Sequence, residues 1–247
     1  CSLYRWFWWG YIFYQPVTCF INHEISFHHF LCIFILNPRF MKQVFLIAAL
    51  FSANTVFSQT LIQRDPDIEQ MVKEVSADSL KSYIKTLVAF GTRNTLSTQT
   101  DPGRGIGAAR NWVLAKFNEM AKQSNGRLSA MIDTTTLQPD GRRVDMVLLL
   151  GNVVATLKGT DPGDDRIFII SGHIDNMRSS PTDRIGDAPG ANDDASGTAA
   201  VMECARVMSK RNFPATIIFV AVSGEEQGLL GSNFMSEKAK KEKWNIE

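Results

Sequence analysis

Three segments of the chain place acidic side chains or an imidazole directly after an apolar run: residues 169–175, 189–197 and 222–228. In open α/β sheets, ligands bind at the carboxyl ends of the strands, so we expect these segments to meet at one edge of a sheet. One imidazole with several carboxylates is a ligand set that suits zinc. A glutamate beside a metal-binding glutamate can stay free as the general base of a hydrolysis. The side chains in question are His173, Asp175, Asp193, Asp194, Glu225 and Glu226.

Each segment also has a purely structural interpretation. His173, the only histidine after residue 40, could be a hydrogen-bonded loop residue. Asp193 and Asp194 could cap a helix, and the paired glutamates could be first-turn helix acids. A cap needs only one carboxylate, however, and two adjacent carboxylates repel each other unless a cation is near. Taken together, the three segments favour a metal site.

The elements that must position these residues alternate along the chain. Helical spacing of apolar residues predicts helices over 76–88 and 106–121, separated by a turn-rich loop at 91–103. Short apolar runs at 144–150, 153–157, 167–170 and 216–222 predict buried strands. Residues 195–210 and 229–241 are expected to be helices. The pattern predicts an α/β fold, a three-layer α/β/α arrangement with a mostly parallel or mixed central sheet.

The composition changes sharply near Met41. The first 40 residues hold three of the four cysteines and three of the five tryptophans. Residues 41–58 have a short basic start, an apolar run and small residues before Gln59, which is typical of a secretory signal peptide. We therefore expect residues 1–40 to be non-native upstream translation, 59–75 a lead-in segment and 76–247 the catalytic domain. The alternative for residues 1–40 is an aromatic-rich membrane-surface anchor, since their longest apolar run is too short to span a bilayer.

Several function classes find little support in the sequence. The formal net charge of +1 gives no electrostatic footprint for nucleic acid, and we expect no stable membrane span after signal cleavage. Cys204 would be the single cysteine of the processed chain, and its place in a helical pattern favours a buried, inert thiol. No Gly-x-Ser-x-Gly elbow indicates a serine hydrolase. A turn explains Asp161, Asp164 and Asp165, although calcium binding stays open there.

The sequence resembles the co-catalytic zinc aminopeptidases, the bacterial leucyl aminopeptidase group (metallopeptidase family twenty-eight). The resemblance covers residues 76–247 loosely and 144–235 well. It rests on Ser-Gly-His-Ile-Asp at 171–175, Pro-Gly-Ala-Asn-Asp-Asp-Ala-Ser-Gly at 189–197 and Gly-Glu-Glu-Gln-Gly-Leu at 224–229. It implies peptide substrates and an exported protein, periplasmic or secreted, from a bacterium.

The resemblance also implies a role for each matched residue. Asp193 would bridge two zinc ions, with His173 bound to one and Glu226 to the other. Asp175 would support the site from behind the ligands. Glu225 would be the general base that takes a proton from the metal-bridging water and passes it to the leaving amine. The substrate's free α-amino group would sit at the metals, so residues would be removed one at a time from the N-terminus.

The sequence departs from the family pattern downstream. The family has a further Asp and a further His ligand after the paired glutamates, and this chain has no histidine beyond His173 and ends at Glu247. We therefore expect a C-terminally truncated fragment that binds metal weakly and has little activity. The alternatives are a glutaminyl-cyclase-like zinc enzyme, in which Ser rather than Asp194 would follow the bridging Asp, another exopeptidase or ester specificity, and a non-catalytic binding module.

Overall fold

A mixed five-stranded sheet in the order β1-β2-β4-β3-β5 forms the centre of the fold. β3 pairs in parallel with β4 and with β5, whereas β2 pairs antiparallel with both β1 and β4. The carboxyl ends of β3 and β4 therefore lie at the same edge of the sheet. The strands are β1 (Leu128–Leu137), β2 (Leu148–Leu157), β3 (Arg166–His173), β4 (Thr216–Val222) and β5 (Asn245–Ile246).

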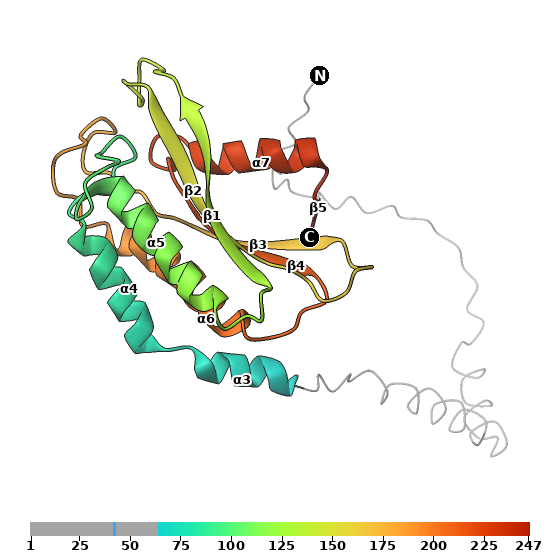
Figure 1. Cartoon of the computed structure of the whole chain (residues 1–247). Coiled ribbons are helices and arrows are strands. Elements are labelled where there is room, and N and C mark those ends of the chain that lie inside the picture. The colour runs from blue at the N-terminus through green and yellow to red at the C-terminus, as the bar shows by residue number, and fades with distance from the viewer. Residues whose placement is uncertain (1–41, 43–63) are drawn as a thin grey trace, which may run out of the picture. The chain divides into compact units, whose positions relative to one another are not determined.

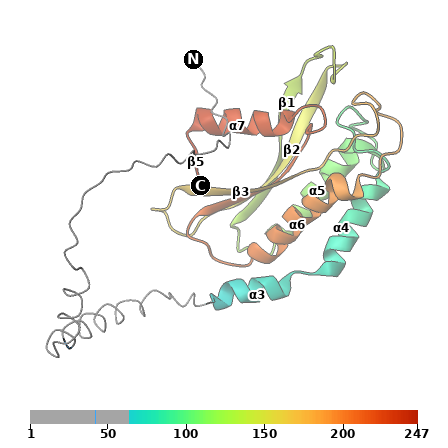
Figure 2. The ribbon, with the colours of Figure 1, turned by 180° about the vertical axis from the view of Figure 1, so that it is seen from behind.

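Helices cover both faces of this sheet, as Figures 1 and 2 show from opposite sides. The helices α4, α5 and α6 gather on one face, and α7 lies on the other. This is the three-layer α/β/α arrangement predicted from the sequence. The helices are α3 (Pro66–Glu74), α4 (Ala77–Ala89), α5 (Gly105–Ala121), α6 (Ser196–Met208) and α7 (Leu230–Glu242), with a short π-helical segment η1 (Ala191–Ala195) before α6.

This computed structural model describes residue 42 and residues 64–247. Residues 64–247 form one unit, which contains the whole predicted catalytic domain. The upstream segment 1–40, the start of the lead-in segment and, apart from Lys42, the predicted signal peptide lie outside the described residues. No helix in the described part of the chain is long and apolar enough to cross a membrane.

Strand β4 shows why a continuous apolar run is needed at the centre of the sheet. Ile217, Phe219 and Ala221 pack into the core beneath α4, α5 and α6. The alternate residues of the same strand pack on the opposite face, against Met235 of α7. A strand that is buried on both faces reads as an uninterrupted apolar run, as observed at 216–222. Its end is therefore held firmly, which matters because the paired glutamates follow it directly.

Two parts of the sheet differ from the sequence-based expectation. Strand β1 was not predicted, because it lies at the edge of the sheet and carries several polar, half-exposed residues. The runs 144–150 and 153–157 were expected to be separate strands, but from Leu148 onward they form the single strand β2. Gly151 and Asn152 in its middle have packing roles rather than turn roles. A Cβ on Gly151 would lie 2.7 Å from a methyl group of Ile132, and buried Asn152 hydrogen-bonds to the segment after β4.

Candidate active site

The end of β3 holds His173 by its backbone on both sides. The backbone N–H of His173 donates to Asp194 Oδ2 at 3.0 Å, and its carbonyl accepts from Thr198 Oγ1 at 2.9 Å. The next residue, Ile174, donates its N–H to the carbonyl of Val222 at the end of β4 (2.8 Å). The neighbouring strand and the start of α6 therefore fix where the imidazole projects.

The two nitrogens of the His173 ring face different partners. Nδ1 lies 3.2 Å from the carbonyl oxygen of Asp175 and 3.7 Å from its Oδ1. Nε2 lies 3.0 Å from Asp193 Oδ1. Burial alone would lower the pKa of His173, but the hydrogen bond to Asp175 and the charges of Asp175, Asp194 and Glu225 raise it to about 9. A ring held through Nδ1 presents Nε2 as the atom available to a ligand.

The adjacent carboxylates of Asp193 and Asp194 have different roles. Asp194 accepts hydrogen bonds from the backbone N–H of Gly197 (2.7 Å), in the first turn of α6, and from that of His173. It therefore satisfies the helix start and ties it to β3. The side chain of Asp193 is 76% exposed and makes its ion pair with His173 alone. One carboxylate thus serves the helix, as its structural interpretation required, and the other is left free.

Asp175 positions the two glutamates after β4. Its side chain is fully buried, and its carboxylate accepts from the backbone N–H of Glu225 (3.3 Å) and of Glu226 (3.1 Å). A third donor is the hydroxyl of Thr95 at 3.1 Å. The chain makes its turn between strand and glutamates at Gly224, where φ is +76°, a conformation that favours glycine. Asp175 therefore joins the ends of β3 and β4.

Glu226 shows that the carboxylates converge. Burial raises the pKa of Glu226, the charges of Asp175, Asp193 and Glu225 raise it further, and His173 opposes the shift. Like charges that disfavour one another's ionisation are a mark of groups that a cation would stabilise. The segments predicted at 169–175, 189–197 and 222–228 are thus brought together at one edge of the sheet.

The donor set at this edge fits zinc by its chemistry. Zinc is bound by imidazole nitrogen and carboxylate oxygen, which His173, Asp193 and Glu226 offer here. Among the described residues, no three His, Cys, Asp or Glu side chains are arranged as they stand to enclose an ion. Mutual repulsion between neighbouring carboxylates accounts for donors that do not close on one point. The individual roles of these residues remain predictions.

Sequence reasoning missed the buried polar residues behind the site, of which Arg93 is the largest. The predicted loop at 91–103 has neither helix nor strand until α5 begins at Gly105, but Arg93 is 0% exposed. Its backbone N–H donates to the side chain of Asn176 (2.8 Å), one residue after Asp175. A signal was present in the sequence, because Arg93 is the only charged residue between Lys85 and Asp101.

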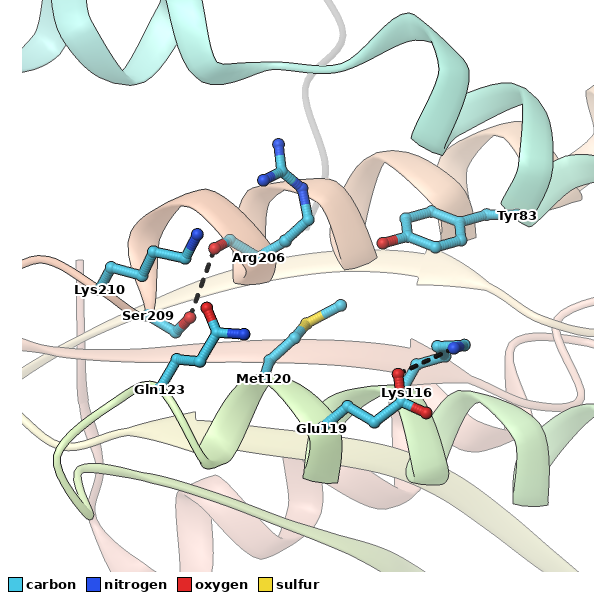
Figure 3. A pocket seen from close by; sticks show the side chains of 8 residues that line it. All are labelled: Tyr83, Lys116, Glu119, Met120, Gln123, Arg206, Ser209 and Lys210. Atoms are coloured by element: carbon cyan, nitrogen blue, oxygen red, sulfur yellow. Dashed lines mark hydrogen bonds and ion pairs between the residues drawn. The ribbon is translucent and has the colours of Figure 1, made fainter.

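A separate cavity of about 170 Å³ lies between the C-terminal halves of α5 and α6 (Figure 3). Lys116 in its wall is paired with Glu119, and Arg206 is paired with Glu203. Since a helix rises about 1.5 Å per residue, Arg206 lies about 15 Å along α6 from its start at the candidate site. This cavity is therefore distinct from the candidate active site, and its arginine and Lys116 are already neutralised.

Comparison with known proteins identifies similar chains. Over 184 residues, the chain is 46% identical to a probable zinc metalloprotease of Pyrenophora teres f. teres (strain 0-1), with 74% of this chain and 39% of that protein covered. A probable zinc metalloprotease of Pyricularia oryzae is 44% identical over 183 residues, with 74% and 36% covered. The chain therefore spans about two fifths of the length of the curated relatives it matches.

Solved structures show the same fold. LapB from Legionella pneumophila superposes with a TM-score of 0.59 at 22% identity, covering 75% of this chain and 45% of that one. The Legionella pneumophila LapA aminopeptidase gives 0.57 at 23% identity, with 75% and 44% covered. Fimbriiglobus ruber glutaminyl cyclase gives 0.53 at 18% identity, with 68% and 57% covered. At these identities the likeness concerns the fold.

The fold and the donor set define the chain as an α/β metallohydrolase. Residues 152–247 match the family model described as Peptidase family M28. The chain belongs to this family of zinc metallopeptidases.

Proposed function

We propose that the protein is an exported zinc aminopeptidase, which removes N-terminal residues from peptides with a two-zinc site. The observation that carries this proposal is the 3.0 Å contact between His173 Nε2 and Asp193 Oδ1, which lies beside a glutamate pair positioned by Asp175. It brings donors from all three sequence motifs to the ends of two parallel strands. Family membership supports peptidase chemistry, and the aminopeptidase specificity is our proposal.

Three residues would hold the metal. Asp193 would bridge two ions, with His173 on one and Glu226 on the other. Asp193 suits a bridging role because its carboxylate is the most exposed of the three and is not used by the helix. When bound, zinc supplies a Lewis acid that polarises the scissile carbonyl and lowers the pKa of a water molecule.

Glu225 is the proposed general base. Its backbone is fixed by the hydrogen bond to Asp175, and its side chain is half-buried, so it stays within reach of a substrate. Its carboxylate takes the proton of the attacking water and donates it to the leaving amine, as a positioned acid–base group must do in amide hydrolysis. Asp175 acts through other groups, because it is fully buried and orients both His173 and the glutamate backbone.

The charges around the site support an N-terminal substrate amine. Among residues 64–247, no lysine or arginine forms an ion pair with Asp193, Glu225 or Glu226. The carboxylates are therefore available to cations, both metal ions and the positively charged α-amino group of a peptide. A site of this charge disfavours the C-terminal carboxylate of a substrate.

Export is part of the same proposal. A signal peptide at 41–58 would deliver the domain that begins near residue 76 to a periplasmic or extracellular location, where zinc and peptides are accessible. The N-terminal sequence of the protein recovered from the culture medium or periplasm tests this directly. An N-terminus close to Gln59 supports the proposal, whereas recovery in the cytosol with the N-terminal segment attached contradicts it.

The main test is the zinc content and activity of the protein expressed from its complete coding sequence. Amino-acid p-nitroanilides and their N-acetylated counterparts form the matched substrate pair. We expect about two zinc ions per protein and hydrolysis of the free-amine substrates only. Cyclisation of N-terminal glutamine with one zinc would indicate a glutaminyl cyclase, and absence of zinc and turnover would indicate a binding module; either result overturns the proposal.

A further inference from the structure

Arg93 is the most completely enclosed charge of the described chain. Its guanidinium donates to four backbone carbonyls: Nε to Ile174 (2.8 Å), Nη1 to Leu87 (3.0 Å) and Pro189 (3.1 Å), and Nη2 to Gly190 (2.9 Å). Its side chain is 0% exposed, and no ion pair of Arg93 occurs among residues 64–247. The side chain thus spends its donors on the backbone of three segments that are far apart in the sequence.

Two of these segments carry the acids of the candidate site. Ile174 directly precedes Asp175, and Pro189 and Gly190 directly precede the turn that carries Asp193. The carbonyl of Gly190 accepts from Arg93 and also from the backbone N–H of Ala195 (3.0 Å), the last residue of η1. Arg93 therefore fixes one end of the Asp193 turn relative to the end of β3.

Gly190 is shaped to the guanidinium. Its φ is +47°, and a Cβ at this position would lie 2.9 Å from Arg93 Nη2 and 2.7 Å from the Cβ of Asn176. Only a residue without a side chain allows the guanidinium to approach this carbonyl so closely. Asn176 completes the arrangement, since its side chain accepts from the backbone N–H of Arg93 and donates to the carbonyl of Ala188.

The charge of Arg93 lies behind an acidic site. Burial lowers the pKa of Arg93 to about 10, and the carboxylates of Asp175 and Asp194 act in the opposite direction. The guanidinium therefore stays protonated at neutral pH and attracts both carboxylates without touching them. It places a buried cation on the protein side of the site and leaves the open side to other cations.

We propose that Arg93 is a positioning residue that sets the distance between the Asp193 turn and the end of β3, and so prepares the zinc ligands before metal binds. The inference rests on the proposed metal role of Asp193. Lysine cannot replace Arg93, because its three N–H donors radiate from one atom, whereas the planar guanidinium reaches Ile174, Pro189 and Gly190 at once. Groups that orient metal ligands from behind typically change metal affinity 10- to 100-fold when mutated.

The test compares Arg93→Lys with Arg110→Lys. Arg110 is a matched control, because it is 7% exposed and its guanidinium also contacts a backbone carbonyl, that of Leu149, but it lies on α5 away from the acids. Zinc affinity is measured by competition with a chromogenic chelator, and local opening by hydrogen–deuterium exchange of peptides covering residues 174–177 and 186–195. Asp193→Asn serves as the reference for loss of a metal ligand.

We expect Arg93→Lys to weaken zinc binding by about 10- to 100-fold and to raise exchange selectively in those two segments. Arg110→Lys should lower global stability and leave zinc affinity within about twofold. Equal zinc affinities for the two variants, or exchange that rises evenly along the chain, would overturn the inference. If Arg93→Lys does not fold, Gly190→Ala disturbs the same contact from the other side and should give the same selective pattern.

The proposed function and this inference can fail separately. If Asp193→Asn leaves zinc affinity unchanged, the proposed metal site is wrong. Exchange in residues 186–195 then still reports whether Arg93 holds the turn. If Asp193→Asn abolishes zinc binding while Arg93→Lys changes neither readout, the metal site stands and the role of Arg93 is refuted.

Discussion

Asp175 and Glu226 are joined by a hydrogen bond of 3.1 Å, in which the backbone N–H of Glu226 donates to Asp175 Oδ2. The second oxygen of the same carboxylate accepts from the N–H of Glu225. The buried acid of the first motif therefore orders the backbone of the third. Its contribution is to stability and geometry, and it can be measured apart from catalysis.

Replacement of Asp175 by Asn should destabilise the protein by about 2–3 kcal/mol, because an amide cannot accept from both glutamate N–H groups and leaves a buried donor unsatisfied. The free energy of unfolding from urea titrations measures this loss. Thr95→Val is the matched control, since it removes a single donor to the same carboxylate and should cost about 1 kcal/mol. A loss for Asp175→Asn no larger than that of the control would show that the carboxylate does not organise the turn.

The adjacent aspartates should separate into a structural and a metal-binding residue. Asp194→Ala should lower the free energy of unfolding by about 1–2 kcal/mol, because it removes the acceptor of Gly197 in the first helical turn. Asp193→Ala should change it by less than about 0.5 kcal/mol, as expected for an exposed side chain. It should, however, abolish the increase of Tm on addition of zinc. Melting curves with and without zinc distinguish the two, and reversed behaviour would contradict the assignment.

The paired glutamates should differ in what they lose. Glu225→Gln should reduce kcat about 10²- to 10⁴-fold with the zinc content unchanged, because the amide cannot accept the proton of water. Glu226→Gln should lower the zinc content itself. Activity on leucine p-nitroanilide and metal analysis of the same preparations make the comparison. If Glu225→Gln loses zinc and Glu226→Gln keeps it, the two roles are interchanged.

Cys204 should react slowly in the folded protein. Burial, followed by the charge of Glu203, raises the pKa of its thiol, so the reactive thiolate is a minor species at pH 8. Alkylation by iodoacetamide, followed by mass spectrometry of the peptide containing Cys204, should be at least about tenfold slower than in urea-unfolded protein. Equal rates in the folded and unfolded protein would show that the thiol is neither buried nor deactivated.

The sequence predicts most of the layer arrangement because the periodicities are strong. Helices α4, α5 and α7 begin and end within about two residues of their expected bounds, and strand β4 matches them, since buried faces leave a clear apolar pattern. Strand β1 escaped because its exposed face is polar. In β2, Gly151 and Asn152 resemble a turn in composition but are dictated by contacts with Ile132 and with the segment after β4.

The candidate site was predictable where its chemistry is carried by unusual residue types. Three motifs at strand ends indicated His173, Asp193 and the glutamates, and the fold brings them to one edge. The division of labour between Asp193 and Asp194 was not predictable, because it depends on which carboxylate meets the N–H of Gly197. The enclosure of Arg93 was not predictable either, since its partners are backbone carbonyls that leave no trace in the sequence.

The close approach of β3 to α6 explains two of the motif glycines. A Cβ on Gly172 would lie 2.7 Å from the carbonyl carbon of Gly197, and a Cβ on Gly197 would collide with the carboxylate of Asp194. The strand and the helix therefore touch backbone to backbone immediately beside His173. Homologous sequences should accordingly keep Gly172 and Gly197 together or change them together, even in members that have lost every catalytic side chain. The glycines of the motif are thus a signature of ancestry and shape, whereas its acids and its histidine are the signature of activity.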